Sequence, residues 1–357
     1  MANEAPFNHE TRSNMKPSHA LPLLLALAGA ALAQSTGAPV PVTVDNFVRA
    51  ESDTYIGNFV KESGGLGKFS HRREVAAIDN QTVIRLNRDT LYSSAVFDLD
   101  AGPVTITLLD AGKRFRSMMV VNQDHYVPAV YYKAGAHTLT RQQVGTRYMA
   151  VAIRTLVDPN DPKDVQAVHA LQDAIKVSQK APGKFEAPNW DAESQKKVRE
   201  ALLALAATRQ GFRNAFGTRK DVDPIAHLLG TAAGWGGNPD KDAVYESAVP
   251  ANNDGTTVYR LNVKQVPVDA FWSVSVYNRE GFFAKNVQKA YSLNNVTAEP
   301  DPDGAYTLQF GGCAVGVRNC LPVTPGWNYT VRLYRPRPEA IDGRWVFPEP
   351  RPVTPGG

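Results

Sequence analysis

The chain has 357 residues, of which 43% are hydrophobic and 21% charged, and its formal net charge is +4. This composition is typical of a globular protein and excludes a disordered chain, and the length predicts two or three domains. The basic residues are scattered along the chain, which argues against a nucleic-acid-binding stripe and predicts no nucleic-acid partner.

The first segment has the features of a secretory signal peptide. Lys16 precedes an apolar run over residues 21–34, and the run ends in Ala31-Leu32-Ala33, a small-x-small cleavage pattern. A membrane helix needs about 20 apolar residues, so this run is too short to be one. We therefore expect residues 1–33 to be a leader, with Met15 as the true start, and the mature protein to be periplasmic or secreted without a membrane span. Retention of the segment as a signal anchor is the alternative.

A helix is predicted next in the chain. Asp45 is its expected N-cap, and Gly64 follows its expected end. Helical spacing predicts that one face carries Val48, Ser52, Tyr55 and Phe59.

From about residue 74 to residue 157 the apolar positions follow a period of two, as in strands. Strands are predicted over residues 83–88, 104–109, 116–122, 127–132 and 147–156. Short strands separated by Gly, Pro and Asp are typical of a β-sandwich, which we expect over residues 45–158.

A helical subdomain is predicted over residues 159–236. Asp161, Asp191 and Asp223 are the expected N-caps of three helices, and the second helix is expected to run as far as Gly217. Strand patterns then return, and a second all-β unit is predicted over residues 237–350. Its expected strands cover residues 257–261, 271–277, 306–310 and 329–334.

Three blocks of sequence together resemble a known family. They are the segments Asn87–Ser93, Gly234–Tyr245 and Val268–Asn278, which read NRDTLYS, GWGGNPDKDAVY and VDAFWSVSVYN. Their order and spacing resemble exported bacterial proteins in which a DUF1254 domain is followed by a DUF1214 domain, over residues 45–350.

The resemblance implies a mainly β protein with an N-terminal immunoglobulin-like sandwich, a helical middle and a C-terminal jelly roll. It implies no cofactor and provides no catalytic residue set. The loop between Cys313 and Cys320 departs from the family pattern.

The two cysteines are seven residues apart in a Gly-containing loop. An exported protein meets an oxidising compartment, so we expect Cys313 and Cys320 to form a disulfide that stabilises the fold by about 2–3 kcal/mol. Free thiols and a redox pair are the alternatives.

The block Asn87-Arg88-Asp89-Thr90 is the best candidate for a polar site. Arg and Asp side chains together can hold a ligand carboxylate or sugar hydroxyls. The alternative is an internal network that fastens the β-unit to its neighbours. If the block is a strand, Arg88 and Asp89 point to opposite faces and serve different partners.

Aromatic residues provide a second set of candidates. Trp235, Trp272 and Tyr291 could form a floor for a sugar or an apolar ligand, but aromatic residues at alternating strand positions more often pack in a sandwich core.

Catalytic candidates are Asp89, Asp124 and His125, as acid or base residues of a cofactor-independent, esterase-like hydrolase. The sequence has no Gly-x-Ser-x-Gly nucleophile motif and no His-Glu-x-x-His metal motif. His125 with His137 and a carboxylate could hold a metal, but hydrogen-bonded histidines are favoured and no metal site is predicted.

The leading functional hypothesis is an exported protein that binds a small or oligomeric ligand, or assembles as a homo-oligomer, through clefts between its two β-units. The hydrolase is the first alternative. A purely structural, envelope-associated oligomer is the second.

Overall fold

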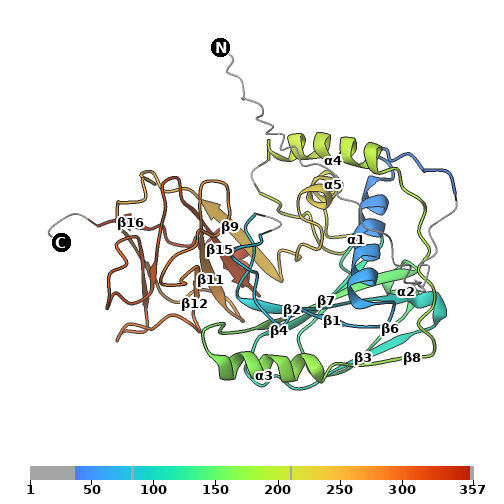
Figure 1. Ribbon diagram of the computed structural model, residues 1–357, viewed down its shortest axis with the longest axis horizontal. Coiled ribbons are helices and arrows are strands. Elements are labelled where there is room, and N and C mark those ends of the chain that lie inside the picture. The colour runs from blue at the N-terminus through green and yellow to red at the C-terminus, as the bar shows by residue number, and fades with distance from the viewer. Residues whose placement is uncertain (1–36, 82–83, 210, 354–357) are drawn as a thin grey trace, which may run out of the picture. The chain divides into compact units, whose positions relative to one another are not determined.

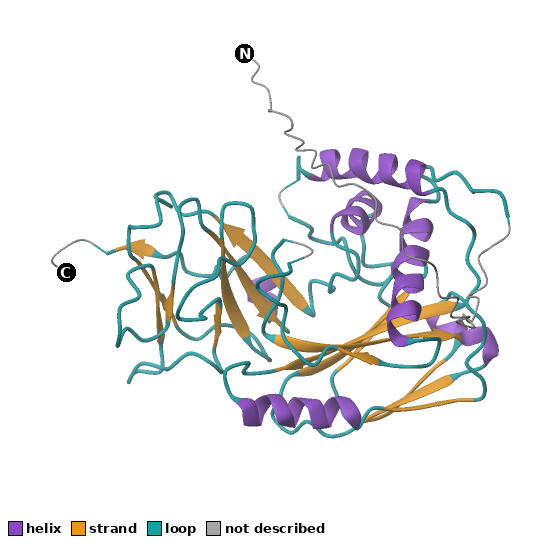
Figure 2. Ribbon diagram, viewed as in Figure 1, coloured by secondary structure: helices purple, strands orange, loops and turns teal. Residues whose placement is uncertain are grey.

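The computed structural model describes residues 37–81, 84–209 and 211–353, so the expected leader over residues 1–33 lies outside the described residues. The described chain is mainly β, with a few helices, and residues from Gly37 onward form one compact unit (Figures 1 and 2). None of the described helices is both long enough and apolar enough to cross a membrane.

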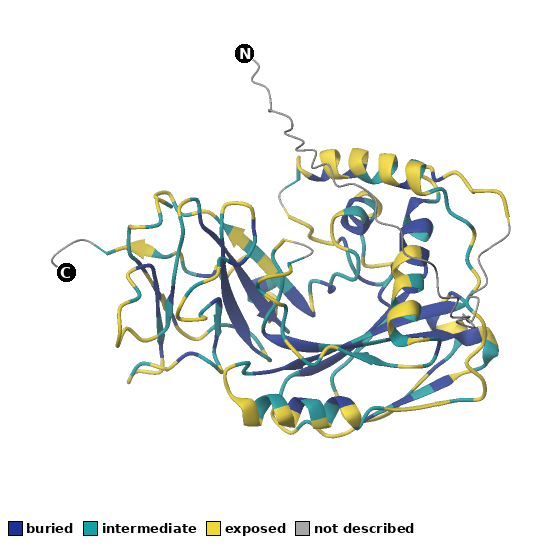
Figure 3. Cartoon of the chain, in the orientation of Figure 1, coloured by how far each residue is buried: buried dark blue, intermediate teal, exposed yellow. Residues whose placement is uncertain are grey.

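The N-terminal half is built on two sheets. The larger has the antiparallel order β1-β2-β7-β4-β5, and the smaller has the antiparallel order β6-β3-β8. Their strands are β1 (Ser70–His71), β2 (Thr90–Asp98), β3 (Val104–Leu108), β4 (Arg116–Asn122), β5 (Ala129–Tyr131), β6 (Gly135–Leu139), β7 (Tyr148–Leu156) and β8 (Lys176–Gln179). Apolar side chains from both sheets share one core, which includes Phe97, Ile106, Met118 and Val151. Figure 3 shows that β2, β7 and β4 are buried along most of their length.

The N-terminal half also contains helices. They are α1 (Phe47–Ser63), the 3-10 turn η1 (Leu99–Ala101), α2 (Arg141–Val144), α3 (Pro162–Asp173), α4 (Ala192–Ala206) and α5 (Pro224–Ala233). A second apolar cluster joins α1 to α4 and α5 through Phe47, Leu202 and Leu229.

The C-terminal half contains two four-stranded sheets, β12-β11-β15-β9 and β14-β13-β10-β16. Their strands are β9 (Ala243–Ala248), β10 (Tyr259–Val263), β11 (Trp272–Tyr277), β12 (Ser292–Asn294), β13 (Tyr306–Phe310), β14 (Cys320–Leu321), β15 (Asn328–Tyr334) and β16 (Arg351–Pro352), and α6 (Pro338–Ile341) follows β15. All pairings are antiparallel except that of β13 with β14. One core joins both sheets and includes Trp272, Phe310 and Trp327.

Several predicted elements are confirmed. β4 and β13 have the predicted bounds, and α3 and α5 begin directly after the predicted caps Asp161 and Asp223. Both aspartates accept a hydrogen bond from a backbone N–H of the first turn, which is the physical basis of the signal.

The predicted face of the first helix is only partly right. The N-cap is Asn46, and α1 buries the predicted Ser52 together with Phe47, Ala50 and Ile56, whereas Tyr55 is exposed and Val48 and Phe59 are half-buried. Its buried face also includes the charged residues Glu51 and Asp53. A face with buried charges cannot be recognised from apolar spacing.

Three other expectations are corrected. Residues 84–88 are not a strand, because Arg85 has a left-handed backbone (φ 55°) and its N–H donates to Gly281 O instead of to a neighbouring strand. α4 ends at Ala206, well before Gly217. The helical subdomain predicted over residues 159–236 also contains a strand, β8, which pairs with β3.

Candidate functional site

The segment Asn87–Thr90 is a turn that leads into β2. The Asp89 N–H donates to the side-chain oxygen of Asn87 over 2.6 Å, and Asp89 O accepts from the N–H of Val157. Asparagine favours such turns because its side chain can replace a backbone acceptor. The turn fixes the directions of the Arg88 and Asp89 side chains.

Asp89 is a buried carboxylate, only 2% exposed. Its Oδ1 accepts hydrogen bonds from Ser292 Oγ at 3.0 Å and from Asn294 Nδ2 at 3.2 Å, both on β12. Its Oδ2 is buried and has no donor among the described residues. Buried polar atoms almost always have a partner, so we expect a water or a ligand to donate to this oxygen, as to Asp242 Oδ2, the other buried carboxylate oxygen without a donor among the described residues.

A chain of hydrogen bonds connects Asp89 to a buried cation. Arg332 donates to Ser275 Oγ at 2.9 Å, Ser275 donates to Ser292 at 3.0 Å, and Ser292 donates to Asp89. The two serine hydroxyls of this chain therefore point their hydrogens toward the carboxylate.

Arg88 lies beside Asp89 in the same pocket wall. Its guanidinium lies over the Tyr291 ring, 5.2 Å from the centroid, and one of its nitrogens donates to Ala76 O. Burial lowers the pKa of Arg88, but an arginine starts so far above neutral pH that it stays charged. The segment is a turn and not a strand, so the argument for opposite faces does not apply: both residues line the pocket, although they have different protein partners, as predicted.

The pocket has a volume of about 160 Å³. It is lined mostly by polar side chains: besides Arg88, Asp89 and Tyr291 the wall includes Asn160, Gln288, Lys289, Ser292, Asn294 and Thr297. Only Arg88, Asp89 and Tyr291 were predicted from the sequence as site residues.

Asn87 does not line this pocket. Its amide donates to Tyr334 Oη at 2.8 Å and to Tyr92 Oη at 3.4 Å. Burial raises the pKa of Tyr334 well above its ordinary value, so this hydroxyl stays neutral. Asn87 is therefore a positioning residue that fastens the turn to β15.

The two tryptophans lie elsewhere. Trp272 is buried in the C-terminal core, where it packs edge-on against Tyr306, so its ring is closed to a ligand. Trp235 stacks on Tyr55 at 4.8 Å and on His125 at 5.2 Å, and its Nε1 donates to Ser52 Oγ. The expected aromatic floor is therefore not assembled: Tyr291 alone of the three lines the pocket.

His125 is completely buried, and both of its ring nitrogens have partners. Nε2 accepts from the N–H of Gly236 at 2.8 Å, and Nδ1 lies 2.7 Å from Thr231 Oγ1. Because the Thr231 hydroxyl donates to His227 O, it accepts from His125, which fixes the proton on Nδ1. Burial and the neighbouring His227 hold the pKa of His125 well below its usual range. These contacts make His125 a structural residue.

Asp124 points away from that cluster and pairs with Arg49 at the surface. His137 also lies apart, with Nε2 near Lys133 O and its ring against Tyr131. Over residues 37–81, 84–209 and 211–353, no group of three His, Cys, Asp or Glu side chains is arranged to hold a metal. The structure therefore does not bring together the acid and base residues predicted from the sequence, which are Asp89, Asp124 and His125.

Cys313 and Cys320 form the predicted disulfide, with an S–S distance of 2.09 Å. It closes the loop that lies between β13 and β14.

A larger pocket of about 400 Å³ lies beside Asp53, between α1 and the start of β7. Burial raises the pKa of Asp53, and donors from Gln123 and Trp190 oppose that effect. Both carboxylate oxygens of Asp53 have protein donors, Gln123 at 2.8 Å and Trp190 at 3.0 Å, so neither oxygen needs a hydrogen bond from a ligand in this pocket.

Two family models match the chain in the expected order. DUF1254, a protein family of unknown function, matches residues 66–138, and DUF1214, also of unknown function, matches residues 244–338. The chain belongs to the two-domain DUF1254–DUF1214 family. Arg88 and Asp89 come from the DUF1254 region, and Tyr291, Ser292 and Asn294 come from the DUF1214 region, so the pocket is shared by both.

Solved structures show the same fold. The VPA0106 protein from Vibrio parahaemolyticus is 19% identical, with a TM-score of 0.69 over 87% of this chain and 98% of that one. An uncharacterized protein from Burkholderia cenocepacia is 15% identical, with a TM-score of 0.51 over 86% of each chain. No curated protein matches this DUF1254–DUF1214 sequence.

Proposed function

We propose that this protein binds a small, uncharged, hydroxyl-rich ligand such as a sugar or polyol in the pocket between Asp89 and Tyr291. The observation that carries the proposal is the Asp89 carboxylate, which is buried in the wall of a polar pocket with Oδ2 left without a donor.

The charges of the wall favour hydroxyl groups over other ligands. Asp89 needs a donor and repels an anion, whereas Arg88 and the exposed Lys289 offer donors and repel a cation. A hydroxyl both donates and accepts, so one sugar can satisfy both side chains in charge-assisted hydrogen bonds. Neutral donors and acceptors on Asn160, Gln288, Asn294 and Thr297 line the same wall.

The hydrolase hypothesis finds no comparable support. It needs an acid and a base that reach the same substrate. Asp89 lines the pocket, but Asp124 pairs with Arg49 elsewhere and both nitrogens of His125 are engaged inside the fold. Binding without turnover is therefore the function that we favour.

We also propose the finer points of architecture and location as predictions. The shared cores support an immunoglobulin-like sandwich over residues 45–158, a helical subdomain over residues 159–236 and a jelly roll over residues 237–350. The disulfide supports a periplasmic or secreted location, since disulfides persist in oxidising compartments. Assembly as a homo-oligomer stays a prediction.

A thermal-shift screen tests the binding proposal. Neutral sugars and polyols form one arm, and carboxylates, amines and amino acids form the others. A ligand at a hundredfold excess over its Kd stabilises the folded protein by about 2.7 kcal/mol. We expect a shift with the neutral hydroxylated arm. A response confined to the charged arms, or to none, contradicts the proposal.

Asp89→Asn is the decisive variant in that screen. Its amide oxygen can still accept from Ser292 and Asn294, so the fold is kept, but an N–H₂ group replaces Oδ2 and the acceptor for the ligand is lost. Asp79→Asn is the matched control, because Asp79 is an exposed aspartate paired only with Lys285. The shift should disappear in the first variant and persist in the second.

A further inference from the structure

A second pocket adjoins the one beside Asp89. It has a volume of about 380 Å³, and three residues, Gln288, Leu293 and Thr297, line both pockets. The two hollows are therefore neighbours across a shared wall, and together they offer far more room than one small ligand needs.

The disulfide loop builds the far wall of the second pocket. Residues Cys313, Ala314, Gly316, Val317, Arg318, Asn319 and Cys320 line it, facing Glu299 and Thr297. Its lining mixes polar side chains with Leu293, Ala314 and Val317, and Arg318 lies close to Glu299 at 3.4 Å. This resembles the chemistry beside Asp89, where an arginine and a carboxylate also share one wall.

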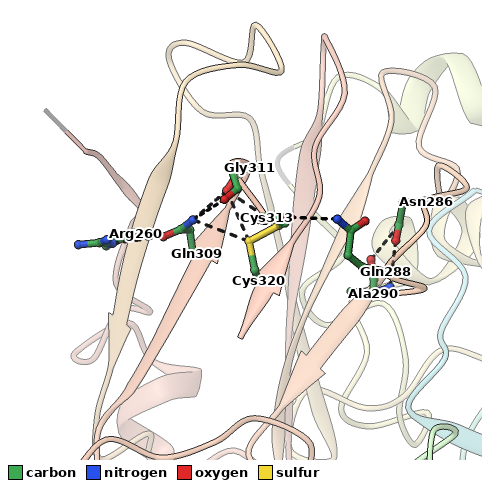
Figure 4. Close-up of a disulfide and its surroundings, with 9 residues drawn as sticks. Arg260, Asn286, Gln288, Ala290, Gln309, Gly311, Cys313 and Cys320 are labelled. Carbon is green, nitrogen blue, oxygen red and sulfur yellow. Dashed lines mark hydrogen bonds between the residues drawn. A yellow bond between two sulfur atoms is a disulfide. The ribbon is translucent and has the colours of Figure 1, made fainter. Parts of the chain in front are cut away.

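The loop is held at both ends, and Arg318 within it also pairs with Glu299. At one end, Gln288 donates to Cys313 O at 3.0 Å, a contact that Figure 4 shows reaching the disulfide from the segment next to the first pocket. At the other end, Asn319 donates to Glu299 O at 2.8 Å. Between them, Val315 is fully exposed, and the S–S bond ties the two ends together.

We infer that the two pockets form one groove with two subsites, and that the ligand is an oligosaccharide whose second sugar lies against the disulfide loop. This inference rests on the proposed function, because it extends the hydroxyl-binding site beside Asp89. It adds that the ligand contains more than one sugar and that the disulfide shapes the second subsite.

Calorimetric titration of the full chain tests the inference. The probes are glucose with maltotriose and cellotriose, and N-acetylglucosamine with chitotriose. We expect a trisaccharide to bind at least about tenfold more tightly than its monosaccharide, a difference that corresponds to 1.4 kcal/mol. Equal Kd values for monomer and trimer overturn this inference alone. Binding of neither contradicts the proposed function as well.

Two variants separate the second subsite from the first. In Cys313→Ser/Cys320→Ser the loop is no longer closed, so the advantage of the trisaccharide should fall to within about threefold while the Kd of the monosaccharide is unchanged. If that double variant does not fold, Ala314→Trp fills the second pocket without touching the disulfide and should have the same effect. Val315→Trp, on the exposed tip outside the lining, is its control. A trisaccharide advantage that survives Ala314→Trp overturns the inference.

Discussion

Complete burial and two hydrogen bonds give His125 a measurable role in stability. Because the folded state holds its pKa well below 6.5, the unfolded chain binds a proton more readily as the pH falls. The folded state therefore loses stability on acidification, and the loss begins near pH 6.5.

His125→Gln isolates this effect, since glutamine can still accept from Gly236 and does not titrate. Between pH 7.5 and 5.5 the free energy of unfolding of the wild type should fall by about 1.4 kcal/mol more than that of the variant, on the basis of one histidine with an unfolded pKa of about 6.5. Urea unfolding at both pH values measures the difference. Equal slopes would show that His125 titrates alike in both states.

The sequence predicts part of the site at this scale. Arg88 and Asp89 are recognisable because charged neighbours interrupt an apolar pattern. Ser292 and Asn294 are not, because they lie more than 200 residues away and reach Asp89 only when β12 pairs with β11. Trp272 is a candidate for both a ligand contact and the core because an aromatic on a strand looks the same in either place, and the structure buries it in the core.

At the scale of elements, the contact between α1 and α4 depends on a buried charge. Glu51 is buried on α1 and accepts from Arg199 Nε at 2.9 Å and from Gln195 Nε2 at 2.7 Å, both on α4. Removing one partner of such a pair leaves the other charge without compensation.

Glu51→Ala should lower the free energy of unfolding by about 3 kcal/mol, at the lower end of the range for buried pairs because Arg199 is partly exposed. Glu193→Ala is the matched control on α4, since its pair with Lys197 is exposed and contributes less than about 0.5 kcal/mol. Chemical denaturation compares the two. Similar small losses would mean that the helices are held by apolar contacts alone.

Elements with simple periodicity were predictable, and those that depend on distant partners were not. β4 and β13 follow their apolar patterns closely. Residues 84–88 alternate in the same way, but hydrogen bonds hold their backbone: the Arg85 N–H donates to Gly281 O, and Arg332 donates to Arg85 O. Local sequence does not reveal these distant partners. β8 forms by pairing with β3, so its own composition gives little indication of a strand.

At the scale of the whole molecule, polar contacts join the N-terminal segment before β2 to the C-terminal sheet. The buried Arg332 on β15 donates to Arg85 O at 2.8 Å and to Leu86 O at 3.3 Å, and Tyr277 Oη donates to Leu86 O. These contacts predict that the two halves unfold together, in one calorimetric transition.

Arg332→Met removes the donors and leaves the two carbonyls with fewer partners, at a cost of about 1–3 kcal/mol for each one that becomes unsatisfied. We expect scanning calorimetry to show a lower Tm and a split into two transitions. Arg344→Met, at an exposed arginine paired only with Asp342, should leave a single transition at the wild-type Tm. Two transitions in the wild type itself would contradict the account.

The central claim is that Asp89 receives a hydroxyl donor from a ligand. The most direct test is a calorimetric titration of the wild type, Asp89→Asn and Asp79→Asn with the neutral sugar that gives the largest thermal shift. The account predicts that Asp89→Asn weakens binding at least about a hundredfold, equivalent to 2.7 kcal/mol, and that Asp79→Asn binds as the wild type does. Equal affinity in all three proteins would contradict it.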